Sequence, residues 1–324
     1  METKLAERSG FDIKEFAKKN VIWAVFLAEV IVFSIVNPSF IQSSNIVAIG
    51  RQIAVYGIAS VGMTFVILIA GIDLSAGTVI TLVNIVCAYF IINSGMNLWV
   101  ATILALVVAT LVGLLNGFMV STIGIPAIIA TFAAQTIFEG AAYLISGGLP
   151  IPLERNTAFD LFGRWAIGPI PVSVIIMIIC FALGSFILNK SYFGRYFYAI
   201  GGNEEAAKLS GIRVNRIKYL IYALSGFFAG LAGIVLLSRT GSAQNTAGKG
   251  LEFDFITCVV LGGVSVNGGV GRMSGVIAGV LIIGALNNGM ILMDVSTYTQ
   301  MIVKGLVLAV AVGFDCISKK KQAN

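Results

Sequence analysis

Long apolar runs, separated by short polar segments, occupy most of this 324-residue chain. A helix needs about 20 mainly apolar residues to cross a bilayer. Runs that approach this length lie at about residues 21–36, 53–70, 76–92, 98–120, 125–145, 172–189, 217–238, 253–266, 273–292 and 299–314. The pattern predicts an all-α, polytopic membrane protein with about ten transmembrane helices. Because several runs are short or interrupted by glycine, eight helices remain an alternative.

The basic residues predict how the chain is oriented. If ten spans begin in the cytoplasm, 15 of the 21 Lys and Arg residues lie in inner segments and five in outer ones. Basic residues in short loops favour the inside, so we expect both termini in the cytoplasm. The prediction is a cytoplasmic N-terminal segment over residues 1–20, one transmembrane domain over 21–314, and a basic cytoplasmic tail over 315–324.

The composition excludes several classes of protein. Hydrophobic residues make up 58% of the chain and charged residues 11%, whereas soluble domains carry roughly 25% charged residues. With no histidine and four scattered cysteines, no metal site, cofactor site or catalytic centre is predicted. The one Gly-Lys pair, Gly248-Lys249, lacks the Ser or Thr of a phosphate-binding loop. The basic excess belongs to cytoplasmic loops rather than to nucleic-acid binding.

Two loops are long enough to have a role of their own. Residues 146–171 contain four prolines and are expected outside the membrane. Residues 190–216 are expected in the cytoplasm, and here Asn203 is a plausible helix N-cap, Glu204 and Glu205 suit the first turn, and Gly211 is a natural stop. This predicts a short amphipathic cytoplasmic helix, with a simple solvated connector as the alternative.

Glycine is concentrated in a third polar segment, residues 262–272, with the sequence GGVSVNGGVGR. It lacks the preceding strand and the spacing of a dinucleotide-binding site. We therefore interpret it as a flexible break or a close contact between two spans.

An internal repeat relates the two halves of the chain at an offset of 171 residues. The polar pairs at this offset are Asp73 with Gln244, Ser75 with Thr246, and Asn116 with Asn287. A repeat of five spans, an odd number, places its second copy upside down. The sequence thus predicts an inverted 5+5 repeat, which is typical of transporters whose substrate path lies near the centre of the membrane.

The same pairs predict a translocation pathway. Its expected lining is Asp73, Ser75, Asn116, Gln244, Thr246, Asn287 and Asn288. Amides and hydroxyls bind a neutral polyhydroxy solute, so a sugar fits better than a phosphate ester. The alternative is that these groups hydrogen-bond between helices. Likewise, the irregular segments at 71–77 and 240–248 either line a cavity or lie at the membrane surface.

Ionisable residues inside apolar runs are functional candidates by default. They are Glu29, Asp73, Glu139, Asp254 and Lys304. For Glu29, Glu139 and Asp254 a structural role is the favoured interpretation. Lys304 is expected either to extend toward the membrane surface or to pair with a carboxylate.

Several long motifs occur in the order found in one transporter family. They are GMTFVILIAGIDLSAGT, GRYFYAIGGNEEAAKLSGIRVNRIK, SAQNTAGKGLEFD, VVLGGVSVNGGVGR and LNNGMILMDVSTYTQMIVKG. From about Val36 onward the chain resembles the permease subunits of ribose-type ABC sugar importers, within the branched-chain/ribose permease superfamily. The resemblance implies a type II ABC importer-like permease in the bacterial inner membrane.

The resemblance also implies partners and a coupling site. The partners are a second permease subunit, identical or paralogous, a cytoplasmic ABC ATPase and a periplasmic sugar-binding protein. ABC importer permeases dock their ATPase through an E-A-A-x-x-x-G motif, which Glu205, Ala206, Ala207 and Gly211 match here, with Glu204 beside them. The I-x-L-P that follows in the fuller motif is absent.

Three other classes remain as alternatives. An ion-coupled secondary sugar transporter needs coupled carboxylates in the membrane, and this chain offers at most Asp73 and Glu139. A passive channel needs no cytoplasmic docking helix. A membrane enzyme needs catalytic groups that the sequence lacks.

Overall fold

The computed structural model describes residues 13–153 and 157–323. The first twelve residues of the predicted N-terminal segment and Asn324 lie outside this range, as do the side chains of the predicted tail lysines, Lys319, Lys320 and Lys321. The helices are α1 (Ile13–Val36), η1 (Pro38–Ile41), α2 (Ser43–Leu68), α3 (Ala76–Ile92), α4 (Leu98–Phe118), η2 (Met119–Ile123), α5 (Ala127–Ser146), α6 (Thr157–Gly163), α7 (Val172–Lys190), α8 (Tyr192–Gly202), α9 (Glu204–Leu209), α10 (Val214–Thr240), α11 (Leu251–Leu261), α12 (Met273–Leu292) and α13 (Thr297–Ala323).

Every one of the ten predicted apolar runs lies on a helix, and the all-α prediction is confirmed. In the described part of the chain, seven helices are long and apolar enough to cross a membrane, and Val21–Val36 and α3 are shorter apolar helices. The helix that contains the predicted run at 253–266 is too short to span: α11 has 11 residues and extends about 16 Å. That is about half of a hydrocarbon core of roughly 30 Å, so α11 cannot span a bilayer by itself.

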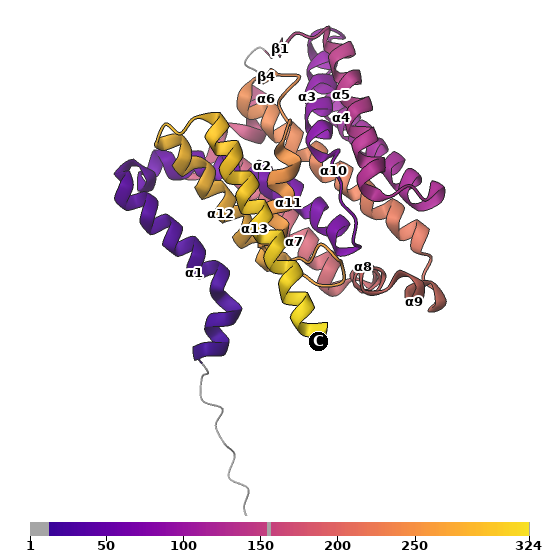
Figure 1. Cartoon of the computed structure of the whole chain (residues 1–324). Helices are drawn as coiled ribbons and strands as arrows, with labels where there is room; N and C mark the ends of the chain where they lie inside the picture. Colours follow the sequence, from indigo (N-terminus) through magenta and orange to yellow (C-terminus); the bar gives the residue numbers. More distant parts are fainter. Residues whose placement is uncertain (1–12, 154–156, 324) are drawn as a thin grey trace, which may run out of the picture.

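Short strands occur only at the ends of helices in the described residues. β1 (Ile151–Pro152) pairs antiparallel with β4 (Ser242–Ala243), and β2 (Ala166–Ile167) pairs with β3 (Ile170–Pro171). Figure 1 shows β1, β4 and α6 at one end of the bundle and α8 and α9 at the other. The described ends of α1 and α13 lie at the same end as α8 and α9 (Figure 1), as an even number of crossings requires.

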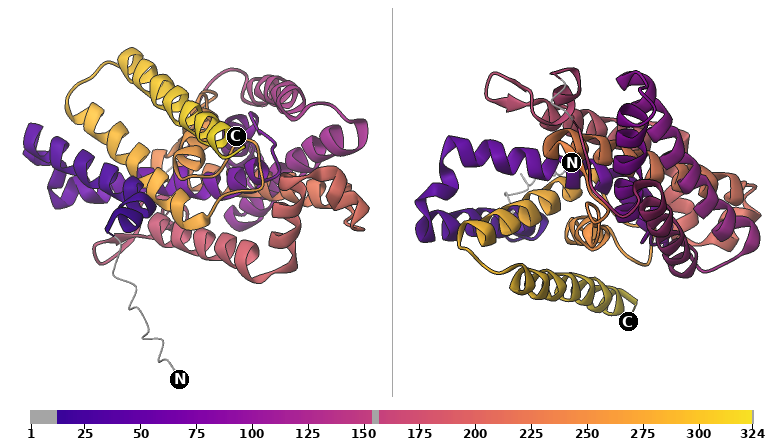
Figure 2. Two further views of the ribbon diagram at one scale, coloured as in Figure 1. Left: turned by 60° about the horizontal axis from the view of Figure 1, so that its bottom comes forward. Right: turned by 90° about the horizontal axis from the view of Figure 1, so that it is seen from above.

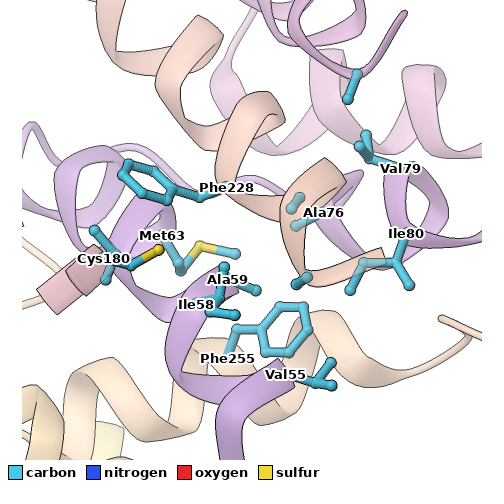
Figure 3. Close-up of a cluster of buried hydrophobic side chains, with 14 of the residues drawn as sticks. Val55, Ile58, Ala59, Met63, Ala76, Val79, Ile80, Cys180, Phe228 and Phe255 are labelled. Carbon is cyan, nitrogen blue, oxygen red and sulfur yellow. The ribbon is translucent and has the colours of Figure 1, made fainter. Parts of the chain in front are cut away.

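The core is built around α2. All sixteen residues from Ile53 to Leu68 are buried, so this helix is covered on every side. Figure 3 shows a cluster that contains α2 side chains such as Ile58 and Met63 together with Ile80 of α3, Phe228 of α10 and Phe255 of α11. A helix that is hydrophobic all round is expected in such a buried position.

The helices follow the internal repeat. Helix α2 begins at Ser43 and α10 at Val214, which is the predicted offset, and α3, α4 and α5 correspond in order to α11, α12 and α13. Packing across the repeats is reciprocal, because α4 and α3 lie against α10 whereas α12 and α11 lie against α2. Small residues allow this close approach: a Cβ atom at Gly113 of α4 would overlap the backbone of Tyr222 in α10.

Two repeat-related glycines touch each other at the centre. A Cβ atom at Gly77 would overlap the carbonyl oxygen of Gly248, and one at Gly248 would overlap the carbonyl oxygen of Gly77. A contact between i and j that is repeated between j and i is the mark of two-fold symmetry. The approximate two-fold axis therefore passes between these residues, which supports the predicted repeat.

The least buried helices lie at the edge of the molecule. Of the seven long apolar helices, α13 and its repeat counterpart α5 have the smallest buried shares. Figure 2 shows α13 along one side, separate from most of the bundle. Its principal neighbour is α11.

Candidate functional site

The predicted cytoplasmic segment folds into two consecutive helices. α8 begins at the Ser191 cap, and α9 follows directly after Asn203. The side chain of Asn203 accepts a hydrogen bond from the amide of Ala206 at 2.9 Å, which confirms the predicted N-cap. Gly211 has φ +83°, a left-handed conformation that ends the helix and favours glycine. The predicted short helix is α9, which is six residues long and makes between one and a half and two turns.

Helix α9 presents one covered and one open face. Ala207 is buried, whereas Glu205, Ala206 and Leu209 are exposed, the last at 89% of its surface. The open face of α9 therefore carries a carboxylate and an exposed apolar side chain, Leu209. The predicted motif residues are thus brought together on one helix, with Gly211 just beyond it.

Ion pairs hold α9 against α10. Glu204 lies 2.8 Å from Nζ of Lys218 on α10 and 3.2 Å from Nζ of Lys208, and Glu205 lies 2.9 Å from Lys208. Partial burial would raise the pKa of Glu204, but its bonds to Lys218 and Lys208 outweigh burial and lower that pKa overall. The same carboxylates raise the pKa of Lys208 through hydrogen bonds.

Three of the predicted pathway residues meet in a buried network. Oδ1 of Asp73 accepts hydrogen bonds from the amide and hydroxyl of Ser75, at 3.0 and 2.6 Å, and its Oδ2 accepts one from Ser225 of α10 at 2.7 Å. Asn116 of α4 donates to Oγ of Ser75 at 2.8 Å. All four residues are at most 1% exposed. The network therefore joins α3, α4 and α10 in the interior of the molecule.

The other four predicted pathway residues lie elsewhere. Asn287 donates to the hydroxyl of Tyr56 at 3.2 Å, and Asn288 exchanges two hydrogen bonds with Asn45 at 2.9 Å each. Gln244 and Thr246 are exposed in the segment before α11. The predicted pathway residues thus lie in separate parts of the structure. Several of them hydrogen-bond one helix to another. Their role as a pathway remains a prediction.

Charged residues gather where α11 meets α5 and α13. Lys304 of α13 pairs with the buried Asp254 of α11 at 2.9 Å, which is the pairing alternative predicted for this lysine. Glu252 is 2% exposed and accepts a hydrogen bond from Gln135 of α5 at 3.3 Å. Glu252 is absent from the predicted site residues, because the predicted apolar run begins at residue 253. Its position two residues before Asp254 was the available signal.

An apolar groove lies between α5 and α13. Its volume is about 310 Å³, and it is lined by Ile72, Leu74, Ile128, Phe253, Ile256, Val266, Leu308 and Val312. Phe253 is half exposed there. The groove thus receives residues from the irregular segment 71–77, from α11, from loop 262–272 and from both edge helices.

Comparison with known proteins defines the class. Residues 45–312 match the family described as branched-chain amino acid transport system / permease component. No solved structure matches the chain. The chain belongs to this permease family, and it is a transport subunit rather than an enzyme.

Relatives of high similarity carry specific names. The ribose import permease protein RbsC of Bacillus subtilis (strain 168) is 45% identical over 295 residues, covering 91% of this chain and 90% of the relative. RbsC of Escherichia coli (strain K12) is 42% identical, with 99% and 100% covered. The L-arabinose transport system permease protein AraH of the same organism is 37% identical, with 97% and 95% covered.

Proposed function

We propose that this chain is the membrane-spanning permease subunit of an ATP-driven ABC importer. In this role it passes a ribose-like monosaccharide, received from a periplasmic binding protein, into the cytoplasm. Its similarity to ribose import permeases over nine tenths or more of each chain supports the sugar class. The ion-coupled sugar transporter, kept as an alternative from the sequence, finds no support among these relatives.

The observation that carries the proposal is the geometry of α9. A transporter that hydrolyses ATP in a separate subunit needs a rigid contact on its cytoplasmic side. Helix α9 is capped at Asn203, tied to α10 through Lys218, and exposes Glu205, Ala206 and Leu209. A force on this face is therefore passed to a membrane helix rather than dissipated in a loop. We assign ATPase docking to Glu204, Glu205, Ala206, Ala207 and Gly211.

A second permease subunit, identical or paralogous, fits the edge formed by α5 and α13. These two helices have the least buried surfaces of the seven long apolar helices, and they flank the groove that contains Phe253. They are also repeat equivalents, so a partner placed there would meet both halves of the chain in similar ways. The sugar would then pass along this edge; Gln244 and Thr246 are exposed in the segment before α11.

Reconstitution tests the proposal. The chain is placed in vesicles with a candidate ATPase and a candidate binding protein, and uptake of labelled ribose is followed with and without ATP. The expected result is accumulation that requires ATP and all three components. Accumulation driven by an ion gradient without ATP would contradict the proposal.

Docking is tested separately by co-purification of the ATPase. Leu209→Asp should abolish it, because a charge replaces the apolar contact on α9. Leu149→Asp is the matched control, since Leu149 is also highly exposed but lies between α5 and β1, and β1 is at the end of the bundle opposite α9 (Figure 1). If Leu209→Asp retains the ATPase as well as the control does, the assignment of α9 is wrong.

A further inference from the structure

The glycine-rich loop 262–272 packs directly against the end of α8, the helix that precedes α9. At the end of α8, Gly201 and Gly202 pack backbone to backbone against Gly268 and Gly269 of the loop. A Cβ atom at Gly201 would overlap the carbonyl oxygen of Leu68, the last residue of α2. Side chains are thus excluded at this junction, and a shift of α8 has no flexible side chain to absorb it.

Hydrogen bonds reinforce this junction. The hydroxyl of Tyr198 on α8 donates to the carbonyl of Gly271 at 2.9 Å, and the amide of Gly269 donates to the carbonyl of Leu68 at 2.9 Å. The loop has its own internal bond from the amide of Ser265 to the carbonyl of Val270 at 2.9 Å. It is therefore an ordered element that touches α8 and α2 together.

The other side of the loop is attached to α13. Oδ2 of Asp315 accepts hydrogen bonds from the hydroxyl of Ser265 at 2.8 Å and from the amide of Val266 at 3.2 Å. Helix α13 is otherwise poorly covered, and among its described side chains Lys304 also ties it to α11, through the pair with Asp254. Asp315 thus links the exposed helix α13 to loop 262–272, which is packed against α8.

We propose that loop 262–272 transmits the displacement of α9 to α13, with Asp315 as the positioning residue that fastens the loop to α13. The inference rests on the proposed function, because it assumes that an ATPase moves α9. A simple break between two spans would need neither the glycine contacts to α8 nor a charged side chain bonded to the loop. The position of α13 beside the groove then connects ATP hydrolysis to the sugar path.

The ratio of ribose transported to ATP hydrolysed in the full reconstituted complex measures this role. Asp315→Ala should leave ATPase co-purification unchanged and lower the ratio by about tenfold or more, because it removes both hydrogen bonds that Asp315 accepts from the loop. Asp315→Glu should restore part of it. The control is Asn267→Ala, in the same loop and exposed. An unchanged ratio for Asp315→Ala would overturn the inference.

A reversible disulfide between loop 262–272 and α13 tests the same inference within one folded protein. Ser265→Cys and Asp315→Cys are combined in a chain whose four native cysteines are replaced by serine. The disulfide takes the place of the hydrogen bonds, so the oxidised protein should couple transport to ATP and the reduced protein should not. Equal coupling in both forms would overturn the inference. If the unmodified complex shows no ATP-dependent uptake, the proposed function itself fails.

Discussion

The ion pair between Lys304 and Asp254 should be a main support of α13, and breaking it by Lys304→Met tests this. The side chain of Asp254 is 5% exposed, that of Lys304 is 28% exposed, and their charged atoms are 2.9 Å apart. With an effective dielectric constant of about 20, the attraction at this distance is roughly 6 kcal/mol. Removing one partner leaves a buried charge, for which the net loss is about 3–5 kcal/mol.

The assay is unfolding of the purified chain in mixed micelles, followed by fluorescence. Lys304→Met should lower the free energy of unfolding by about 3 kcal/mol. The control Lys249→Met should change it by less than about 1 kcal/mol, because Lys249 is 71% exposed and 4.0 Å from Glu139.

A double variant shows whether the unpaired charge is the cause. Adding Asp254→Leu to Lys304→Met removes the stranded carboxylate, so stability should return to near that of the unmodified chain. If the double variant is as unstable as the single one, the loss came from packing and the electrostatic reasoning is refuted.

Three further predictions concern helix packing and the helix α9. Gly113→Leu should prevent stable folding, because α4 and α10 touch there, whereas Gly140→Leu, with open space around it, should be tolerated; size-exclusion profiles compare them. Asn203→Ala should destabilise α9 by about 1 kcal/mol, seen as faster hydrogen exchange of its amides. Since its ion pairs lower the pKa of Glu204 below 4.5 in the folded protein, their contribution should be full above pH 4.5 and fade as the pH falls through the lowered pKa. Glu204→Gln should remove that pH dependence of exchange in α9.

The sequence predicted the helices well because the membrane imposes a single rule. Apolar runs of sufficient length must form helices in a bilayer, where backbone groups have no water to bond. The ten runs therefore appear as ten helices, although α11 is too short to cross. Local signals were equally direct at α9, where Asn203 and Gly211 occupy the cap and the stop.

The polar residues were harder to place. The repeat predicted that Asp73, Ser75 and Asn116 belong together, and they do share one network. Their repeat partners do not mirror it, since Gln244 and Thr246 are exposed while Asn287 bonds Tyr56. Equivalent positions in a repeat share backbone geometry, but each side chain bonds whatever its own neighbours offer.

By itself, the sequence determined the class of protein, the helices, the repeat and the cap and stop of α9, because these depend on hydrophobicity and on residues close together in the chain. Only the tertiary structure decided the contact of Gly77 with Gly248, the pairing of Lys304 with Asp254, and the attachment of loop 262–272 to Asp315. These join residues that are distant in the chain, and their partners are selected by how the helices pack. A hydropathy pattern specifies that a helix is buried or exposed, but not which helix lies beside it.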